Sequence, residues 1–200
     1  VFDELVDDFD KIFRGTNMDG TTAAEQIFIT GYMGVRRDVD LRLKVSNNSS
    51  SNYAHQPLDQ SVEYTNYGWD DMNAFLRNKS MIKNLFSDII STVTTKDGGS
   101  VYIHCWQGAD RTGFVCMVLE AVLGVSEKDT SIDYELTSFS VCGSRWRDKS
   151  YVDELWHYFP GLEKVHTFSG ENLNEKAENF LLDAGITQGQ LSDFRSAMLE

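Results

Sequence analysis

The feature that most constrains this chain is a short apolar run that ends in a cysteine and leads, through a brief interval, into a long apolar segment. Residues 101–105 read Val-Tyr-Ile-His-Cys, a composition typical of a buried strand, and Gly108 indicates a turn after it. Residues 111–124 are apolar on nearly all sides, as in a helix buried within an α/β layer. The sequence therefore predicts a strand, a tight loop and a helix, with Cys105 and Arg111 at the two ends of the loop.

The predicted loop is suited to bind an anion. A short loop that joins a strand end to a helix start brings several backbone N–H groups toward one point, and the helix N-terminus adds partial positive charge there. A thiol in such surroundings, beside a guanidinium, is favoured in its nucleophilic thiolate form. Arg111 carries a planar fork of donors that matches two oxygens of a phosphate. Cys105 and Arg111 together therefore predict nucleophilic attack on a bound phosphoryl group.

The spacing within this loop is specific. His104 and Cys105 are followed by five residues and then by an Arg-Thr pair. This pattern resembles the signature of cysteine-dependent protein tyrosine phosphatases and of their dual-specificity and lipid-directed relatives. The form found here, Cys105-x-x-Gly108-x-Asp110-Arg111-Thr112-Gly113, resembles the signature of the bacterial branch of this superfamily. That branch carries an aspartate just before the arginine.

Four further segments resemble the same bacterial branch. Residues 13–15 are similar to its early F/Y-R-S/G segment, and residues 39–42 are similar to its V-D-L-R strand. Residues 133–137 resemble the helix after its signature, and residues 184–195 resemble its C-terminal ending. The resemblance thus covers almost the whole chain. It implies an α/β fold with a central, mostly parallel sheet of about four to five strands flanked by helices.

The resemblance also implies the chemistry of the site. Cys105 would attack phosphorus to give a phosphocysteine, and Arg111 would hold the phosphoryl oxygens together with the loop amides. Thr112 would stabilise the thiolate when it leaves in the second step. No metal and no other cofactor is required, and the scattered histidines and cysteines do not have metal-ligand spacing. The predicted substrate-binding residues of the loop are Trp106, Gln107, Gly108, Ala109, Thr112 and Gly113.

The general acid has two candidate positions. A phenolate leaving group has a pKa of about 10, so its departure at neutral pH is helped by a proton donor. Asp110 lies in the loop itself, where the resemblance places the acid, and we favour it. The rival is the segment Trp69-Asp70-Asp71, which is similar to the mobile Trp-Pro-Asp loop of other tyrosine phosphatases but lacks the proline. These aspartates could equally cap the following helix.

By this resemblance, the expected substrates are phosphotyrosine proteins or peptides. Lipid-directed relatives commonly carry lysine where Ala109 stands, so a phosphoinositide or inositol phosphate phosphatase is the alternative. A non-catalytic phosphate-binding pseudophosphatase is a further alternative, although the chain retains Cys105, Arg111 and Thr112. A rhodanese-type sulfurtransferase also uses a cysteine in an anion-binding loop, but its active loop is shorter than the interval here.

Composition limits the partners and the setting. The 200 residues are 41% hydrophobic, which is enough for a full core and predicts one phosphatase domain over 1–200. A net charge of −13 disfavours nucleic acid and membrane insertion, so we expect a phosphorylated protein, peptide or small molecule as partner. Three cysteines do not suggest a disulfide framework and favour a reducing compartment such as the cytoplasm. The chain begins at Val1, so a removed leader, and hence secretion, stays open.

The N-terminal half contains further helix and strand patterns. We expect a short covering helix within residues 1–13, and a capping box at 22–25 that opens a helix to about residue 32. Period-two alternation predicts a strand over 39–43. Arg42 on this strand would lie near the phosphate loop by the resemblance, or would be a solvated strand-end arginine.

The other segments are predicted from the same kinds of pattern. The polar residues 46–52 predict a surface loop, and residues 62–67 predict a strand. Arg145, Arg147 and Lys149 form the main cationic cluster, either to contact substrate phosphates or as ordinary surface charge. Helical spacing predicts helices over 72–93 with a break near 78–80, over 126–139, over 171–182 and over 187–199.

Overall fold

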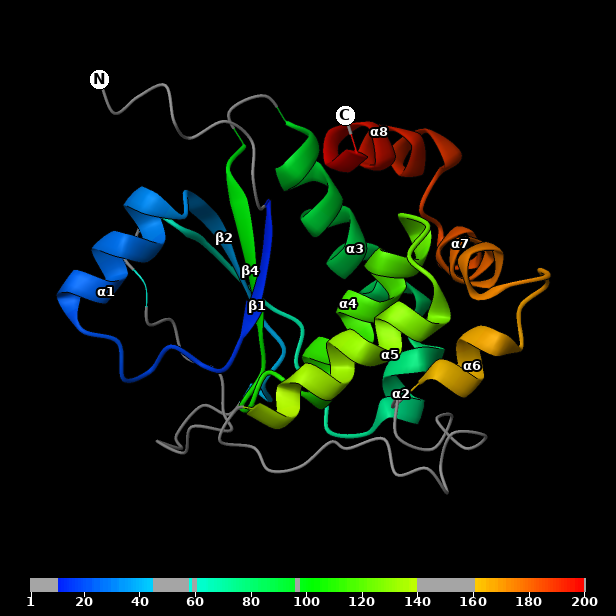
Figure 1. Cartoon of the computed structure of the whole chain (residues 1–200), viewed down its shortest axis with the longest axis horizontal. Coiled ribbons are helices and arrows are strands. Elements are labelled where there is room, and N and C mark those ends of the chain that lie inside the picture. Colours follow the sequence, from blue (N-terminus) through cyan, green and yellow to red (C-terminus); the bar gives the residue numbers. More distant parts are fainter. Residues whose placement is uncertain (1–10, 45–57, 59–60, 96–97, 140–160, 200) are drawn as a thin grey trace.

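Four short parallel strands form the centre of the structure (Figure 1). The computed structural model describes residues 11–44, 58, 61–95, 98–139 and 161–199. Across the sheet the strands lie in the order β1 (Ile12–Gly15), β4 (Ser100–His104), β2 (Val35–Asp40) and β3 (Glu63–Asn66). All three neighbouring pairs are parallel. The predicted α/β class with a mostly parallel sheet is therefore confirmed.

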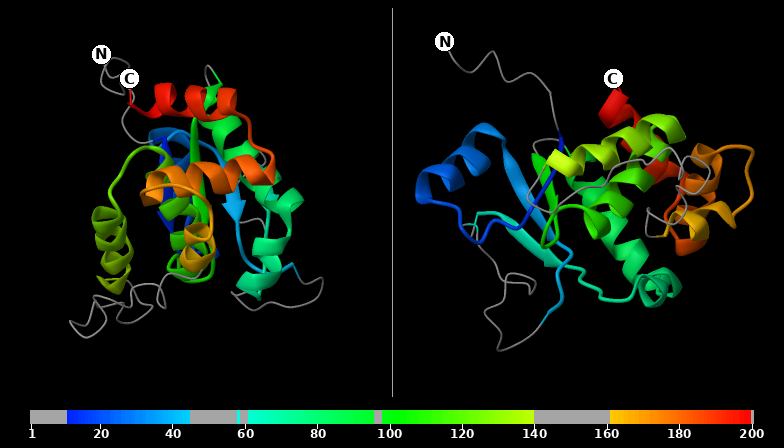
Figure 2. Two further views of the ribbon diagram at one scale, coloured as in Figure 1. Left: turned by 90° about the vertical axis from the view of Figure 1, so that its right-hand side faces the viewer. Right: turned by 60° about the horizontal axis from the view of Figure 1, so that its bottom comes forward.

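Helices cover both faces of this sheet, as expected for parallel strands (Figure 1, Figure 2). A short helix and the π-helical turn that continues it lie on one side: α1 (Ala23–Ile27) and η1 (Phe28–Tyr32). The remaining helices lie on the other side: α2 (Met72–Arg77), α3 (Lys79–Thr94), α4 (Asp110–Val122), α5 (Glu127–Leu136) with the 3-10 turn η2 (Thr137–Phe139), α6 (Leu162–His166), α7 (Leu173–Ala184) and α8 (Gln188–Leu199). Among the described residues, no helix is long and apolar enough to cross a membrane.

The main core lies between the sheet and the larger helical layer. Ile103 of β4 and Phe86 of α3 are fully buried there, and Phe114 anchors α4 in the same core. Helix α4 is buried along most of its length, which explains why its sequence is apolar on nearly all sides. The loop that precedes α4 therefore leads into the most deeply buried helix of the described structure.

Several predicted boundaries are confirmed by their caps. Thr22 and Glu25 form the predicted capping box at the start of α1. Asn78 both ends α2 and caps α3, because its side chain accepts a hydrogen bond from the Met81 amide at 3.1 Å. This is the break that the sequence indicated near 78–80. Polar side chains at these positions compete with the helix for backbone groups and so fix where it starts.

One helix prediction and one strand prediction need correction, and one helix was missed. Residues Ile12 and Phe13, which fall in the expected covering helix, instead belong to β1; residues 1–10 lie outside the described part. Strand β2 spans Val35–Asp40 rather than 39–43, because an interior parallel strand is buried on both faces and does not need to alternate. Helix α6 was not predicted. The predicted loop 46–52 and the cluster of Arg145, Arg147 and Lys149 lie outside the described residues.

Candidate active site

The candidate site is the loop that joins the carboxyl end of β4 to the N-terminus of α4. Ligands of open α/β sheets bind at this end of the strands. Residues Cys105 to Ala109 make the connection, and Gly108 adopts a φ of 71°, a left-handed conformation that favours glycine. The strand, tight loop and buried helix predicted from the sequence are thus present, with Cys105 and Arg111 on either side of the turn.

The segment after β1 packs against the outside of this loop. A Cβ atom added at Gly108 would lie 2.3 Å from the Gly15 carbonyl oxygen, so only glycine fits the approach. The Trp106 carbonyl accepts hydrogen bonds from the Thr16 hydroxyl at 2.7 Å and from the Asn17 side-chain amide at 2.8 Å. These contacts fix the first part of the loop to the neighbouring strand end.

Helix α5 supports the loop through two contacts, one direct and one by way of Arg14 of β1. Arg14 forms an ion pair with Asp133 and donates a hydrogen bond to the Gly108 carbonyl at 3.0 Å. The Tyr134 hydroxyl donates to Asp110 Oδ1 at 2.7 Å. Helix α5 therefore contacts Asp110 directly and the turn through Arg14. The sequence suggested this helix only as a family resemblance and gave Tyr134 no role, since no local pattern shows that a tyrosine of α5 reaches Asp110.

The guanidinium of Arg111 is fixed by backbone carbonyls from two other segments. Its Nη1 atom donates to the Leu41 carbonyl at 2.9 Å and to the Trp69 carbonyl at 3.2 Å. Trp69 is itself buried and stacks on Phe75 with a centroid separation of 3.8 Å. The remaining donors of a guanidinium held in this way keep a defined orientation.

The other predicted site residues differ in their exposure. Cys105 is 3% exposed and Ala109 is fully buried, whereas Trp106 is 44% exposed. Gln107 is half-buried. The Thr112 hydroxyl is buried and has no hydrogen-bond partner among the residues that the structure describes. Gly113 packs against α5, where an added Cβ would lie 2.9 Å from the Tyr134 ring.

The rival pair of aspartates has a structural role. Asp71 caps α2, because its Oδ1 accepts a hydrogen bond from the Asn73 amide at 2.8 Å. Asp70 precedes it and is exposed. The alternative that these residues cap the following helix is therefore realised at Asp71.

A buried charge network lies directly beside the candidate site. His104 is fully buried, with Nε2 2.9 Å from Asp38 Oδ1, an ion-pair distance without hydrogen-bond geometry. Asp40 pairs with the fully buried Arg42, which also reaches Asp19 at 2.7 Å. Of the two alternatives for Arg42, the solvated strand-end arginine is therefore wrong. The signal for this network was present in the sequence, because Asp38 and Asp40 interrupt a run that otherwise pairs as an interior strand.

The surrounding carboxylates change the protonation of His104. Burial is the largest single influence on its pKa and favours the neutral ring, but Asp38 and Asp40 together outweigh it and raise the pKa above its usual value. The Nδ1 atom of the ring lies 3.3 Å from the Cys105 carbonyl oxygen. The positive form of His104 is thus stabilised at the point where the loop begins.

Comparison with known proteins identifies the family. A model of the tyrosine phosphatase family matches residues 8–200, which is nearly the whole chain. This chain belongs to the tyrosine phosphatase family. No curated protein matches it. Membership identifies this tyrosine phosphatase as a hydrolase, in agreement with the prediction made from the loop sequence.

Replacement of Gly108 in the tyrosine phosphatase tests the close packing of the loop. We expect Gly108→Ala to lower the free energy of unfolding by more than about 1 kcal/mol, because the native φ and the Gly15 carbonyl both oppose a Cβ. Gly20→Ala is the control: an added Cβ there meets nothing within 4 Å, so the change should stay within about 0.5 kcal/mol. Urea unfolding measures the free energy of unfolding of both variants. Equal losses in the two variants would contradict the close packing at Gly108.

The raised pKa of His104 predicts a pH-dependent stability. A raised folded-state pKa contributes stability that is fully present below the unfolded value of about 6.5 and is lost as the pH rises through the folded value. Urea unfolding at a series of pH values from acid to alkaline measures this. The free energy of unfolding of wild type should fall more steeply with rising pH than that of His104→Gln. Parallel curves would show that His104 makes no such contribution.

Proposed function

We propose that this chain is a cysteine-dependent phosphatase that hydrolyses phosphomonoesters through a phosphocysteine intermediate. The observation that carries the proposal is the arrangement of the loop: Cys105 lies at the end of a central strand, and Arg111 lies in the first turn of the buried helix α4. The turn between them is held by hydrogen bonds from Arg14 and Thr16. Backbone amides at a helix N-terminus and a guanidinium beside them provide the charge complement of a phosphate dianion.

In the first step, the Cys105 sulfur attacks phosphorus, and the bond from phosphorus to the leaving oxygen breaks. Arg111 and the loop amides hold the equatorial oxygens, on which charge is distributed in the transition state. Because Leu41 and Trp69 accept hydrogen bonds from one side of the guanidinium, its orientation is set before the substrate binds. Little reorganisation is then needed during the reaction.

In the second step, water attacks phosphorus and the sulfur leaves as a thiolate, which releases inorganic phosphate. A hydroxyl that donates to the departing sulfur lowers the barrier of this step. Thr112 is suited to this role, because its hydroxyl is buried in the first turn of α4 without another partner in the described residues. The scheme uses no metal ion.

Asp110 is the proposed general acid of the first step and general base of the second. It protonates the leaving oxygen and later removes a proton from the attacking water. The hydrogen bond from Tyr134 supports this assignment, because it orients the carboxyl group in the first turn of α4. Asp71 is already engaged as a helix cap, which makes the rival segment less suited.

Phosphotyrosine proteins or peptides are the proposed substrates. Trp106 presents an exposed aromatic side chain within the loop, which can stack on the ring of an aryl phosphate. Ala109 is fully buried and carries no charge for the further phosphates of an inositol headgroup. A panel of phosphotyrosine peptides, phosphoserine peptides and inositol phosphates, assayed with and without chelator, tests this choice. A preference for inositol phosphates would overturn it.

Replacement of the proposed nucleophile is the first test of the mechanism. Cys105→Ser should abolish turnover of an aryl phosphate, because a hydroxyl is not ionised at neutral pH, and should leave binding of inorganic phosphate measurable by calorimetry. Cys116→Ala is the matched control, since Cys116 lies buried in α4 with a pKa raised to about 12 by burial and remains a thiol. Full activity of Cys105→Ser would contradict the scheme.

The general acid is tested by a pair of aspartate variants. Asp110→Asn should lower kcat for an aryl phosphate about 100- to 10,000-fold and remove the loss of rate at alkaline pH, because an amide cannot supply the proton. Asp70→Asn, which replaces the exposed aspartate of the rival segment, should leave both the rate and the pH–rate profile nearly unchanged. The assignment is wrong if Asp70→Asn shows the larger effect.

A further inference from the structure

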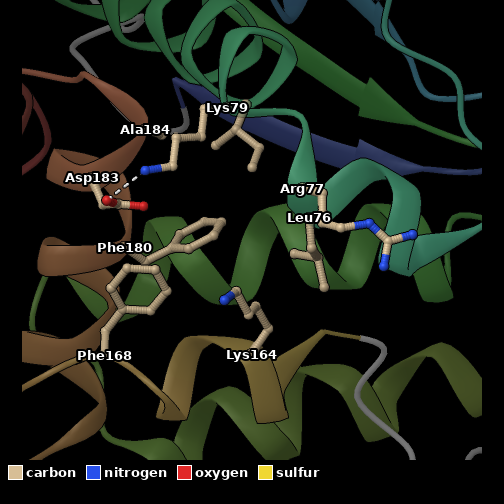
Figure 3. A pocket seen from close by; sticks show the side chains of 9 residues that line it. Leu76, Arg77, Lys79, Lys164, Phe168, Phe180, Asp183 and Ala184 are labelled. Carbon is tan, nitrogen blue, oxygen red and sulfur yellow. Dashed lines mark hydrogen bonds and ion pairs between the residues drawn. The ribbon is translucent and has the colours of Figure 1, made fainter.

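A cavity lies away from the candidate active site, between helices α2, α3, α6 and α7 (Figure 3). Its volume is about 220 Å³, and no residue of the loop between Cys105 and Ala109 lines it. The lining is largely apolar, and its apolar residues come from α2, α3, α7 and the segment between α6 and α7: Leu76, Ile82, Phe168, Phe180 and Ala184. The proposed catalytic mechanism does not use this cavity.

The apolar walls of the cavity are held by packing from the core. Phe180 is buried and packs edge-to-face on both Phe168 and the core residue Phe114, with centroid separations of 5.5 and 6.1 Å. Leu76 and Ile82 are also buried, so the opposite wall belongs to the same core. A cavity with such walls is largely preformed, which reduces the entropic cost of binding a ligand.

The cavity also carries a positive charge that is not neutralised. Lys79 on one side pairs with Asp183 at 2.7 Å, so that these two charges cancel. Lys164 extends from α6 with its ammonium group toward the two phenylalanines, 5.4 Å from the centre of the Phe168 ring (Figure 3). It forms no ion pair with a carboxylate of the described residues. Arg77 also lines the cavity, so its lining carries more cationic than anionic side chains, although the chain as a whole has a net charge of −13.

We propose that this cavity binds a small amphipathic anion, consisting of one aromatic ring or short alkyl chain and one carboxylate. The apolar part fills the space against Phe180, and the carboxylate pairs with Lys164 at the opening. The volume is below the roughly 300 Å³ from which drug-sized ligands are accommodated, so the ligand is a small one. The proposal is independent of the chemistry at Cys105.

The binding experiment uses phenylacetate as the probe and the whole chain. Methyl NMR should show shifts that saturate with phenylacetate and centre on Leu76 and Ile82. Phenylacetamide, which has the same shape without charge, and acetate, which has the charge without the ring, should both bind more weakly. Excess inorganic phosphate should not displace phenylacetate. Displacement, or shifts centred on the loop 105–111, would overturn the proposal.

Two variants test the named contacts. Lys164→Met keeps the side-chain stem and should weaken phenylacetate binding about fivefold, the upper size of an exposed ion pair. Lys128→Met is the matched control, because Lys128 is exposed on α5 and does not line the cavity. Ala184→Met should fill the cavity and abolish binding, with thermal unfolding to confirm that it folds. Equal affinities of the Lys164 and Lys128 variants, or unchanged binding to a folded Ala184→Met, would show that the cavity is not the site.

Discussion

The hydrogen bonds that fix Arg111 are the interaction on which the rest of the site depends. Its guanidinium is held by the carbonyls of Leu41, just beyond β2, and Trp69, just before α2. Trp69 is in turn fixed by stacking on Phe75, which packs against Phe114 of the core. Two segments far apart in the sequence thus orient one cation at the N-terminus of α4. In the proposed mechanism, a phosphate would meet donors that are already arranged before it binds.

The buried charges beside the loop complement this arrangement. Asp38, Asp40, Arg42 and His104 are all fully buried at the carboxyl end of the sheet, where desolvation opposes their charged forms. They are tolerated because each faces an opposite charge at ion-pair distance. Such a network disfavours any other register of β2 against β4, since a shift by one residue would leave an uncompensated charge in the core. The network therefore favours one register of β2 against β4, and this register places the end of β4, from which the loop begins.

The sequence predicted the parts of the structure that rest on local patterns. The Cys105-to-Arg111 loop, the buried helix after it and the break at Asn78 follow from spacing and capping chemistry within a few residues. The sequence did not predict what depends on tertiary contacts. The predicted range of strand β2 was misplaced, because the buried aspartates of this strand are paired with residues outside it. The role of Tyr134 depends on the packing of α5 beside the loop. The hydrophobic periodicity of a single segment does not reveal such contacts between segments.

The central claim is that the sulfur of Cys105 accepts the phosphoryl group. The most direct measurement is to quench the wild-type enzyme with acid during turnover of an aryl phosphate and to locate the phosphate by mass spectrometry of its peptides. The account predicts a phosphate on the peptide that contains Cys105, bound to sulfur and absent when substrate is omitted. A phosphate found reproducibly on a different side chain, with Cys105 unmodified during rapid turnover, would contradict it.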